Sequence, residues 1–119
     1  MNTNQIKLLT KIKELIKSGK CRFEDRDDRN YLNELSELGI SVKEAWNIIL
    51  SLNCHSYFPD QKPNYLKNGE SLVFKRKVNG YLAYIKLKIE ICDNNETTVC
   101  LSFHKDNMWG RYYHVVWQM

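Results

Sequence analysis

The chain has 119 residues, of which 43% are hydrophobic and 12% aromatic, and its 18 Lys and Arg outnumber its 14 Asp and Glu. This length supports one domain with a core of its own, and the composition excludes a disordered tail or a low-complexity linker. We expect a single domain over residues 1–119, with a helical half at about 1–52, a loop at 53–70 and a β-sheet half at 71–119.

Location and cofactors are constrained by the apolar runs and the cysteines. The apolar runs are too short for a membrane-spanning helix, and residues 1–20 alternate Lys with Ile and Leu. No secretory signal is therefore expected, and we place the protein in the cytoplasm without membrane contacts. The four cysteines form no Cys-x-x-Cys pair. A metal site built from Cys54, His55, Cys92 and Cys100 is an alternative, but reduced thiols are favoured, so neither a metal nor another cofactor is expected.

The positive charge is concentrated in the second half of the chain. Residues 1–60 carry nine basic and nine acidic residues, whereas residues 61–119 carry nine basic and five acidic ones. Between Lys67 and Lys88, six basic residues stand against Glu70 alone. A one-sided basic surface is the usual electrostatic feature of nucleic-acid binding, although a solvated, lysine-rich sheet edge gives the same pattern.

Three helices are predicted in the first half. Apolar residues at helical spacing predict the first over 4–18 and the second over 31–38, the latter preceded by an acidic run that suits a helix N-terminus. Ser41 and Glu44 have the spacing of a capping box, which predicts a third helix over about 42–50.

The hydrophobic period changes from 3.6 to 2 after the loop. Runs rich in Val, Ile, Tyr and Phe predict three strands, at 72–78, 81–92 and 97–104. Asn79-Gly80 predicts a type I′ hairpin turn, because this turn needs a positive φ at both central residues. Shorter strand candidates are Cys21–Phe23 and Tyr112–Trp117. The fold class is therefore α+β, with three N-terminal helices packed on a mainly antiparallel β-sheet.

Strand parity predicts which side chains share the exposed face of this sheet. A two-residue turn at Asn79-Gly80 pairs Lys75 with Tyr84, so both point away from the helices. Lys77 then lies on the same face. Arg76 falls on the core side near the end of the sheet, where its stem can be buried while its head reaches water.

Parity also gives an expectation for the third strand. Its apolar residues are expected on the core face: Val99, Leu101 and Phe103. This requires an odd-length loop, which a three-residue turn at 94–96 provides. His104 is then expected beside Lys86, and Ser102 beside Lys88.

Four side chains are thus expected to meet on the exposed face: Lys75, Tyr84, Lys86 and His104. Such a cluster suits metal-independent RNA cleavage, which needs an acid–base group and cations beside the reacting phosphate. His104 supplies the acid–base group, the lysines supply the positive charge, and Tyr84 can hydrogen-bond a phosphate or stack on a base. Cross-strand packing by the tyrosine and solubility from the lysines are the structural alternatives.

The order of motifs resembles a known family. The motifs that carry the resemblance span about residues 5–106: Arg26-Asp27-Asp28-Arg29, the capped helix ending in Ile48-Ile49-Leu50, Val78-Asn79-Gly80, Ala83-Tyr84-Ile85-Lys86-Leu87 and Leu101-Ser102-Phe103-His104. Together they are similar to the MqsR-like branch of toxins from bacterial type II toxin–antitoxin systems.

The resemblance implies a RelE-like fold and an endoribonuclease (an mRNA interferase) that cleaves mRNA without a metal and is neutralised by a cognate antitoxin. It places the family's catalytic tyrosine at Tyr84 and a basic site residue at His104, and it makes Lys62 a candidate for the family's loop lysine. We expect the RNA-binding residues to be Lys62, Arg76, Lys77, Lys88 and Arg111.

Two other classes of function stay open at this point. The same face suits a non-catalytic module that binds nucleic acid or a protein, such as a phage- or plasmid-encoded inhibitor. The aromatic segment from Met108 to Met119 suits an interaction domain, either as an added strand, a base-stacking surface or a partner-binding patch.

Overall fold

The computed structural model describes residues 1–25, 30–59 and 70–106. The elements follow in the order α1 (Thr3–Lys17), β1 (Cys21–Phe23), α2 (Tyr31–Glu37), α3 (Val42–Leu50), the 3-10 turn η1 (Cys54–Ser56), β2 (Ser71–Val78), β3 (Tyr81–Cys92) and β4 (Asn95–Lys105). The fold is α+β, and its four-stranded sheet has the order β1-β4-β3-β2. The strand candidate at Cys21–Phe23 is confirmed as β1, and because it lies between α1 and α2, the N-terminal half is not helical throughout.

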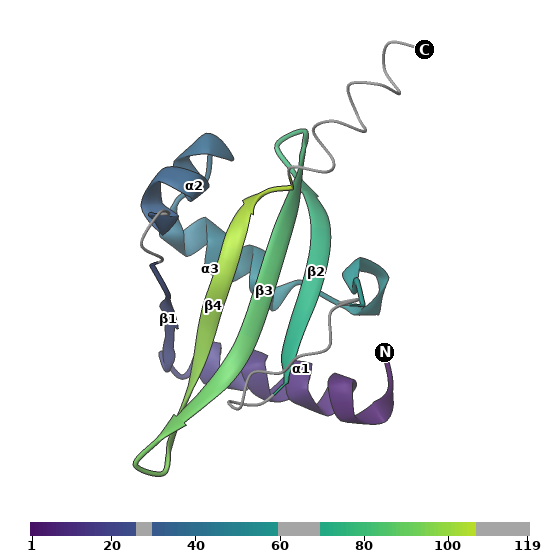
Figure 1. Ribbon diagram of the computed structural model, residues 1–119, viewed down its shortest axis with the longest axis vertical. Helices are drawn as coiled ribbons and strands as arrows, with labels where there is room; N and C mark the ends of the chain where they lie inside the picture. The colour runs from purple at the N-terminus through teal and green to yellow at the C-terminus, as the bar shows by residue number, and fades with distance from the viewer. Residues whose placement is uncertain (26–29, 60–69, 107–119) are drawn as a thin grey trace.

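The sheet is mixed, and the helices cover one of its faces. β1 runs parallel to β4, whereas β2, β3 and β4 are antiparallel to their neighbours. Figure 1 shows α1 and α3 crossing behind the sheet, with α2 beside β4. We call the opposite face, which carries Lys75 and Tyr84, the open face. Between helices and sheet lies one apolar core, whose largest fully buried side chains include Phe74, Ile12 and Ile49.

The helix ends follow from local sequence. The predicted capping box is confirmed: the Ser41 hydroxyl accepts from the Glu44 N–H, and the Glu44 carboxylate accepts from the Ser41 N–H, both at 3.1 Å. Asn2 and Gln5 form a second capping box, at the start of α1. Gly39, after α2, has a φ of 74°, a conformation that favours glycine.

The first hairpin has the predicted register. Asn79 and Gly80 have φ values of 49° and 85°, as a type I′ turn requires. Val78 pairs with Tyr81 and Lys75 with Tyr84. The Asn79 amide also donates to the Leu38 carbonyl at 2.8 Å, which ties this turn to the end of α2.

The second hairpin differs from the prediction. Its turn has two residues, Asp93 and Asn94, with φ values of 50° and 65°, and Cys92 pairs with Asn95. The even loop places Thr98 and Cys100 opposite the core-facing Ile89 and Leu87. The expectation that Val99 and Leu101 face the core is therefore wrong.

A β-bulge then returns the last residues of β4 to the faces of the sheet that strand parity predicted for them. Leu87 pairs with Cys100 but Lys86 pairs with Ser102, so Leu101 is an extra residue on β4. As a result Ser102 lies opposite Lys86 instead of Lys88, and His104 lies opposite Tyr84 instead of Lys86. Phe103 returns to the core, where it is 3% exposed.

The segment expected to be a loop contributes a short extension of the sheet. Tyr57 forms an isolated antiparallel bridge with Phe74, and the Phe58 N–H donates to the Val73 carbonyl at 2.9 Å. The Tyr57 side chain faces the core, where it contacts Phe74 edge-on at 5.8 Å and accepts a hydrogen bond from Gln5 at 2.8 Å. Tyr57 and Phe58 therefore lie beside the outer edge of β2, in positions that continue the sheet.

Several predicted features lie outside the described residues. These are the charged segment Arg26-Asp27-Asp28-Arg29, Lys62, Arg111 and the strand candidate at 112–117. Among the helices that the structure describes, none has the length and apolar character needed to cross a membrane.

Candidate functional site

The centre of the candidate site is a row of three residues on adjacent strands. Lys75 on β2 pairs with Tyr84 on β3, and Tyr84 pairs with His104 on β4. All three side chains belong to the open face, because their strand neighbours Phe74, Ala83 and Phe103 are buried on the helix side. The structure therefore brings these three predicted residues together, and His104 lies nearer to Tyr84 than predicted.

Tyr84 and His104 form a stacked pair. Their ring centroids are 5.3 Å apart and their planes differ by 20°. The Nδ1 atom of His104 lies 2.8 Å from the carbonyl oxygen of Lys105, the next residue in the chain. Because a carbonyl only accepts, we assign the proton to Nδ1, and Nε2 then carries the lone pair in the neutral ring. This is the nitrogen that can take a proton from a substrate.

Lys75 is held between an acidic residue and an aromatic ring. Its Nζ atom lies 2.8 Å from the Asp106 carboxylate and 3.9 Å from the centroid of the Phe58 ring. The Lys75 side chain is 21% exposed and that of Asp106 only 7%. Asp106 thus compensates the lysine's charge in the free protein and fixes its position on the open face.

The remaining lysines form the next rows of the open face. Lys86 lies opposite Val73 and Ser102 and is half-buried. Lys88 is one row further, with its Nζ atom 3.8 Å from the Glu90 carboxylate. Lys77 is exposed, two residues beyond Lys75 along β2. Lys77, Lys86 and Lys88 therefore share the open face with Tyr84, as parity predicted.

Arg76 lies on the other side of the sheet. Its guanidinium donates to the Ile48 carbonyl at 3.4 Å and to the Ser51 hydroxyl, both at the C-terminal end of α3. Positive charge at this end of a helix is favourable, and the guanidinium adds to the hydrogen bonds that the Ile48 carbonyl already accepts from Ser51. The structure therefore gives Arg76 a structural contact and does not bring it to the row of Lys75, Tyr84 and His104.

Phe58 and Asp106 were not among the predicted site residues. Phe58 is 40% exposed and lies on the open face next to Lys75. The adjacent aromatics Tyr57 and Phe58 were the available signal, because neighbouring residues in an extended segment point to opposite faces. Asp106 follows His104 by two residues, which was a parity signal for the same face.

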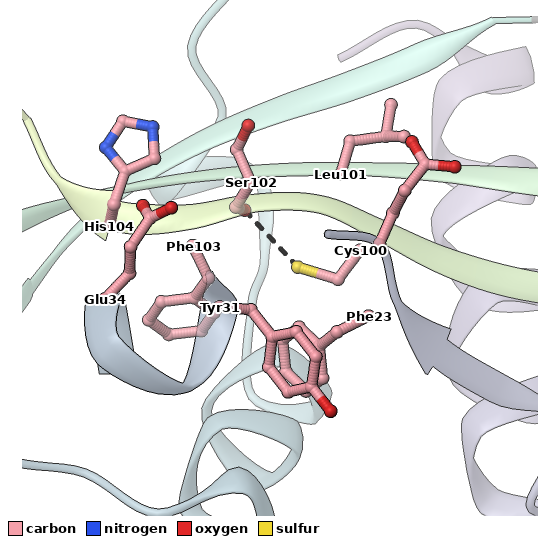
Figure 2. Close-up of a pocket in the computed structure, with 9 residues that line it drawn as sticks. Phe23, Tyr31, Glu34, Cys100, Leu101, Ser102, Phe103 and His104 are labelled. Carbon is pink, nitrogen blue, oxygen red and sulfur yellow. Dashed lines mark hydrogen bonds between the residues drawn. The ribbon is translucent and has the colours of Figure 1, made fainter. Parts of the chain in front are cut away.

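A small pocket adjoins His104 at the edge of β4. Figure 2 shows its lining: Phe23, Tyr31, Glu34, Cys100, Leu101, Ser102, Phe103 and His104. Phe23 stacks on Tyr31 with centroids 4.9 Å apart and planes 10° apart, which closes one side of the pocket. The Cys100 thiol donates to the Ser102 carbonyl at 3.3 Å, and burial raises the pKa of this thiol. Cys100 is thus held as a neutral thiol below the bulge.

The open face combines one acid–base group, aromatic surface and positive charge. In the part of the chain that the structure describes, no three His, Cys, Asp or Glu side chains gather as metal ligands. A scan against models of known protein families and a search of curated proteins find no match to this chain. Function is therefore inferred from the residues of the open face.

Proposed function

We propose that this protein is a metal-independent endoribonuclease that cleaves single-stranded mRNA in the cytoplasm. In this proposal it is the toxin of a type II toxin–antitoxin system, with a RelE-like, MqsR-like fold and a cognate antitoxin as its protein partner. The single observation that carries the proposal is the stacked pair of Tyr84 and His104, set beside Lys75 on the open face.

The chemistry follows from the atoms of this row. Nε2 of His104 takes the proton of a ribose 2′-hydroxyl, and the 2′-oxygen attacks the adjacent phosphorus. The bond from phosphorus to the 5′-oxygen then breaks, leaving a 2′,3′-cyclic phosphate, and the leaving oxygen takes a proton from the imidazolium or from water. The phosphoryl group passes from the 5′-oxygen to the 2′-oxygen. No atom changes its oxidation state, so no electron acceptor is needed.

The other residues stabilise the charge that develops on the phosphate. Lys86, one row from Tyr84, offers an ammonium group on the same face. The Tyr84 hydroxyl can donate a hydrogen bond to a phosphate oxygen. Preorganised donors of this kind act most strongly when the substrate covers the face and excludes water.

The direct test is cleavage of labelled single-stranded RNA in the presence of EDTA. We expect products that end in a 2′,3′-cyclic phosphate, and no cleavage where the residue 5′ of the scissile bond is a deoxynucleotide. His104→Ala should reduce the rate by about 10²- to 10⁴-fold, the usual contribution of a general acid–base group. His55→Ala is the matched control, because His55 is exposed on η1 and is not part of the row of Lys75, Tyr84 and His104.

Two results would overturn the proposal. One is the absence of cleavage in any single-stranded RNA, and the other is a His104→Ala variant as active as the parent chain. The toxin assignment has its own test in growth arrest on expression of the chain. Relief of that arrest by a small protein encoded in the neighbouring reading frame is the expected result, and growth without arrest would contradict it.

A second candidate is a binding module that uses the same face without cleavage. The ion pair between Lys75 and Asp106 favours it, because the carboxylate leaves less positive charge to stabilise the phosphate in the transition state of cleavage. RNA binding that falls steeply with salt, without cleavage by the parent chain, would select this candidate.

A further inference from the structure

Phe58 adds a second aromatic surface to the open face. It lies on the far side of Lys75 from Tyr84, so Lys75 is between two aromatic groups. We infer that Phe58 and the Tyr84–His104 pair are stacking positions for two neighbouring bases of one nucleic-acid strand, with Lys75 at the phosphate between them. The inference rests on the proposed function only in taking RNA as the ligand.

The orientation of Phe58 is fixed by its neighbours. Tyr57 is anchored in the core by Phe74 and by the hydrogen bond from Gln5. The Phe58 N–H is bound to the Val73 carbonyl at 2.9 Å, so the backbone continues the sheet here. Since side chains alternate along an extended segment, Phe58 must point to the open face. The 40% exposure of the Phe58 side chain is therefore a consequence of the hydrogen-bonded backbone that fixes its orientation.

The spacing suits two nucleotides. Neighbouring strands lie about 4.8 Å apart, so the backbone beside β2 that carries Phe58 is about 10 Å from β3, which carries Tyr84. The Lys75 Nζ atom lies over one face of the Phe58 ring, 3.9 Å from its centroid, so a base stacks on the other face of that ring. A strand whose successive bases are splayed apart would place its connecting phosphate over this ammonium group.

Charge on the open face favours a polyanion as the occupant. Five basic residues point from its strands, namely Arg22, Lys75, Lys77, Lys86 and Lys88, against three acidic ones: Glu90 in the strands, Glu24 just after β1 and Asp106 just after β4. Aromatic surfaces combined with such charge are typical of proteins that bind single strands, because each base offers a face for stacking. The bases of a duplex are stacked on one another, so a duplex cannot use Phe58 and Tyr84 in this way.

The test measures binding of 2′-O-methyl oligonucleotides, which lack the hydroxyl nucleophile and are not cleaved. Lengths of one, two and four nucleotides are compared, together with a duplex of the longest. For the parent chain we expect a large gain in affinity from one to two nucleotides and weak binding of the duplex. Phe58→Ala should lose about tenfold in affinity for the longer strands, the usual effect of removing one stacked base contact.

Two further variants and a control separate stacking from folding. Phe58→Tyr keeps an aromatic ring and should bind like the parent chain, whereas Phe58→Leu keeps apolar bulk and should be weak. Leu32→Ala removes another exposed apolar side chain, on α2, and should leave binding unchanged. Thermal unfolding of each variant shows whether the fold is retained.

The outcomes distinguish this inference from the proposed function. Parent-like binding by Phe58→Ala, or equal affinity for duplex and single strand, overturns the inference even if the protein cleaves RNA. If Phe58→Ala loses the increase in affinity from one to two nucleotides, the inference is supported even if no RNA is cleaved. In that case only the catalytic proposal fails.

Discussion

His104 lies directly across from Tyr84 in the neighbouring strand, and the two rings stack with their centroids 5.3 Å apart. The contact does two things at once. It holds the imidazole flat against a neighbour, and it keeps the phenol ring on the same face of the sheet as the imidazole. A ring held in this way has little rotational freedom left to lose, which suits the catalytic role that we propose for His104.

Tyr84→Phe tests the hydroxyl separately from the ring. The variant keeps the stacking with His104, so we expect unchanged affinity for RNA and a fall of about tenfold in the cleavage rate, the size of one lost hydrogen bond to a charged group. Single-turnover cleavage with excess protein measures this. Tyr84→Leu, which also removes the ring, should weaken binding as well, and a parent-like rate for Tyr84→Phe would limit the tyrosine to stacking.

Arg76 and Lys77 are adjacent in sequence but belong to opposite faces of β2. Lys77→Ala should weaken RNA binding and lower the slope of log affinity against log salt by about one, because one phosphate contact is lost. Arg76→Ala should leave binding nearly unchanged but lower the free energy of unfolding by roughly 1 kcal/mol, because α3 loses its bonds from the guanidinium. Fluorescence anisotropy and urea unfolding of both variants measure the two effects, and the reverse assignment would contradict the strand parity.

Asp106→Asn releases Lys75 from its ion pair. We expect tighter RNA binding with a salt dependence steeper by about one ion, because the lysine no longer has a carboxylate partner that competes with phosphate. Stability should fall by about 1–3 kcal/mol, since Asp106 is nearly buried. Asp93→Asn is the charge-matched control in an exposed turn, where asparagine tolerates the positive φ. Unchanged affinity in Asp106→Asn would show that Lys75 does not contact the ligand.

The cysteines should react in an order set by burial. Cys54 and Cys92 are exposed and should be modified rapidly by a thiol reagent at pH 8, whereas Cys100 should not react in the folded protein. Burial raises the pKa of Cys100, so the reactive thiolate is scarce as well as inaccessible. Burial also raises the pKa of Cys21, which should react slowly. Mass spectrometry over time follows each site, with all four reacting in denaturant, and rapid modification of Cys100 in the folded state would contradict its placement.

Sequence patterns were sufficient where one short signal determines the geometry. Asn79-Gly80 admits one turn type, and the turn then sets every pair from Ser71 to Lys88. In β4, by contrast, all residues from Thr98 to Phe103 are buried, so alternation gives no clear choice between faces. A bulge leaves no mark in such a run, and the pairing of His104 was predicted wrongly for this reason.

The contacts around Lys75 show a second limit. Its partner Asp106 is 31 residues away in sequence, and the pair forms only once both hairpins have their final register. The strand-like position of Phe58 depends on a two-residue bridge between a 3-10 turn and a proline, which is too short for any periodicity to appear. Contacts of this kind are set by tertiary structure, and residue type alone does not reveal them.

The extra residue at Leu101 has a consequence for how this protein tolerates change. If β4 continued in the pairing it has at Cys100, His104 would fall opposite Ala83 on the helix side, and Phe103 would emerge beside Tyr84. Deleting Leu101 would remove the bulge and leave the pairs of Leu87 with Cys100 and Lys86 with Ser102 unchanged, so His104 would stay opposite Tyr84. One residue added between Ser102 and His104, by contrast, would turn the imidazole to the helix side. Divergent descendants of this chain should therefore accept other residues, or a deletion, at position 101, while the segment from Ser102 to His104 keeps its length.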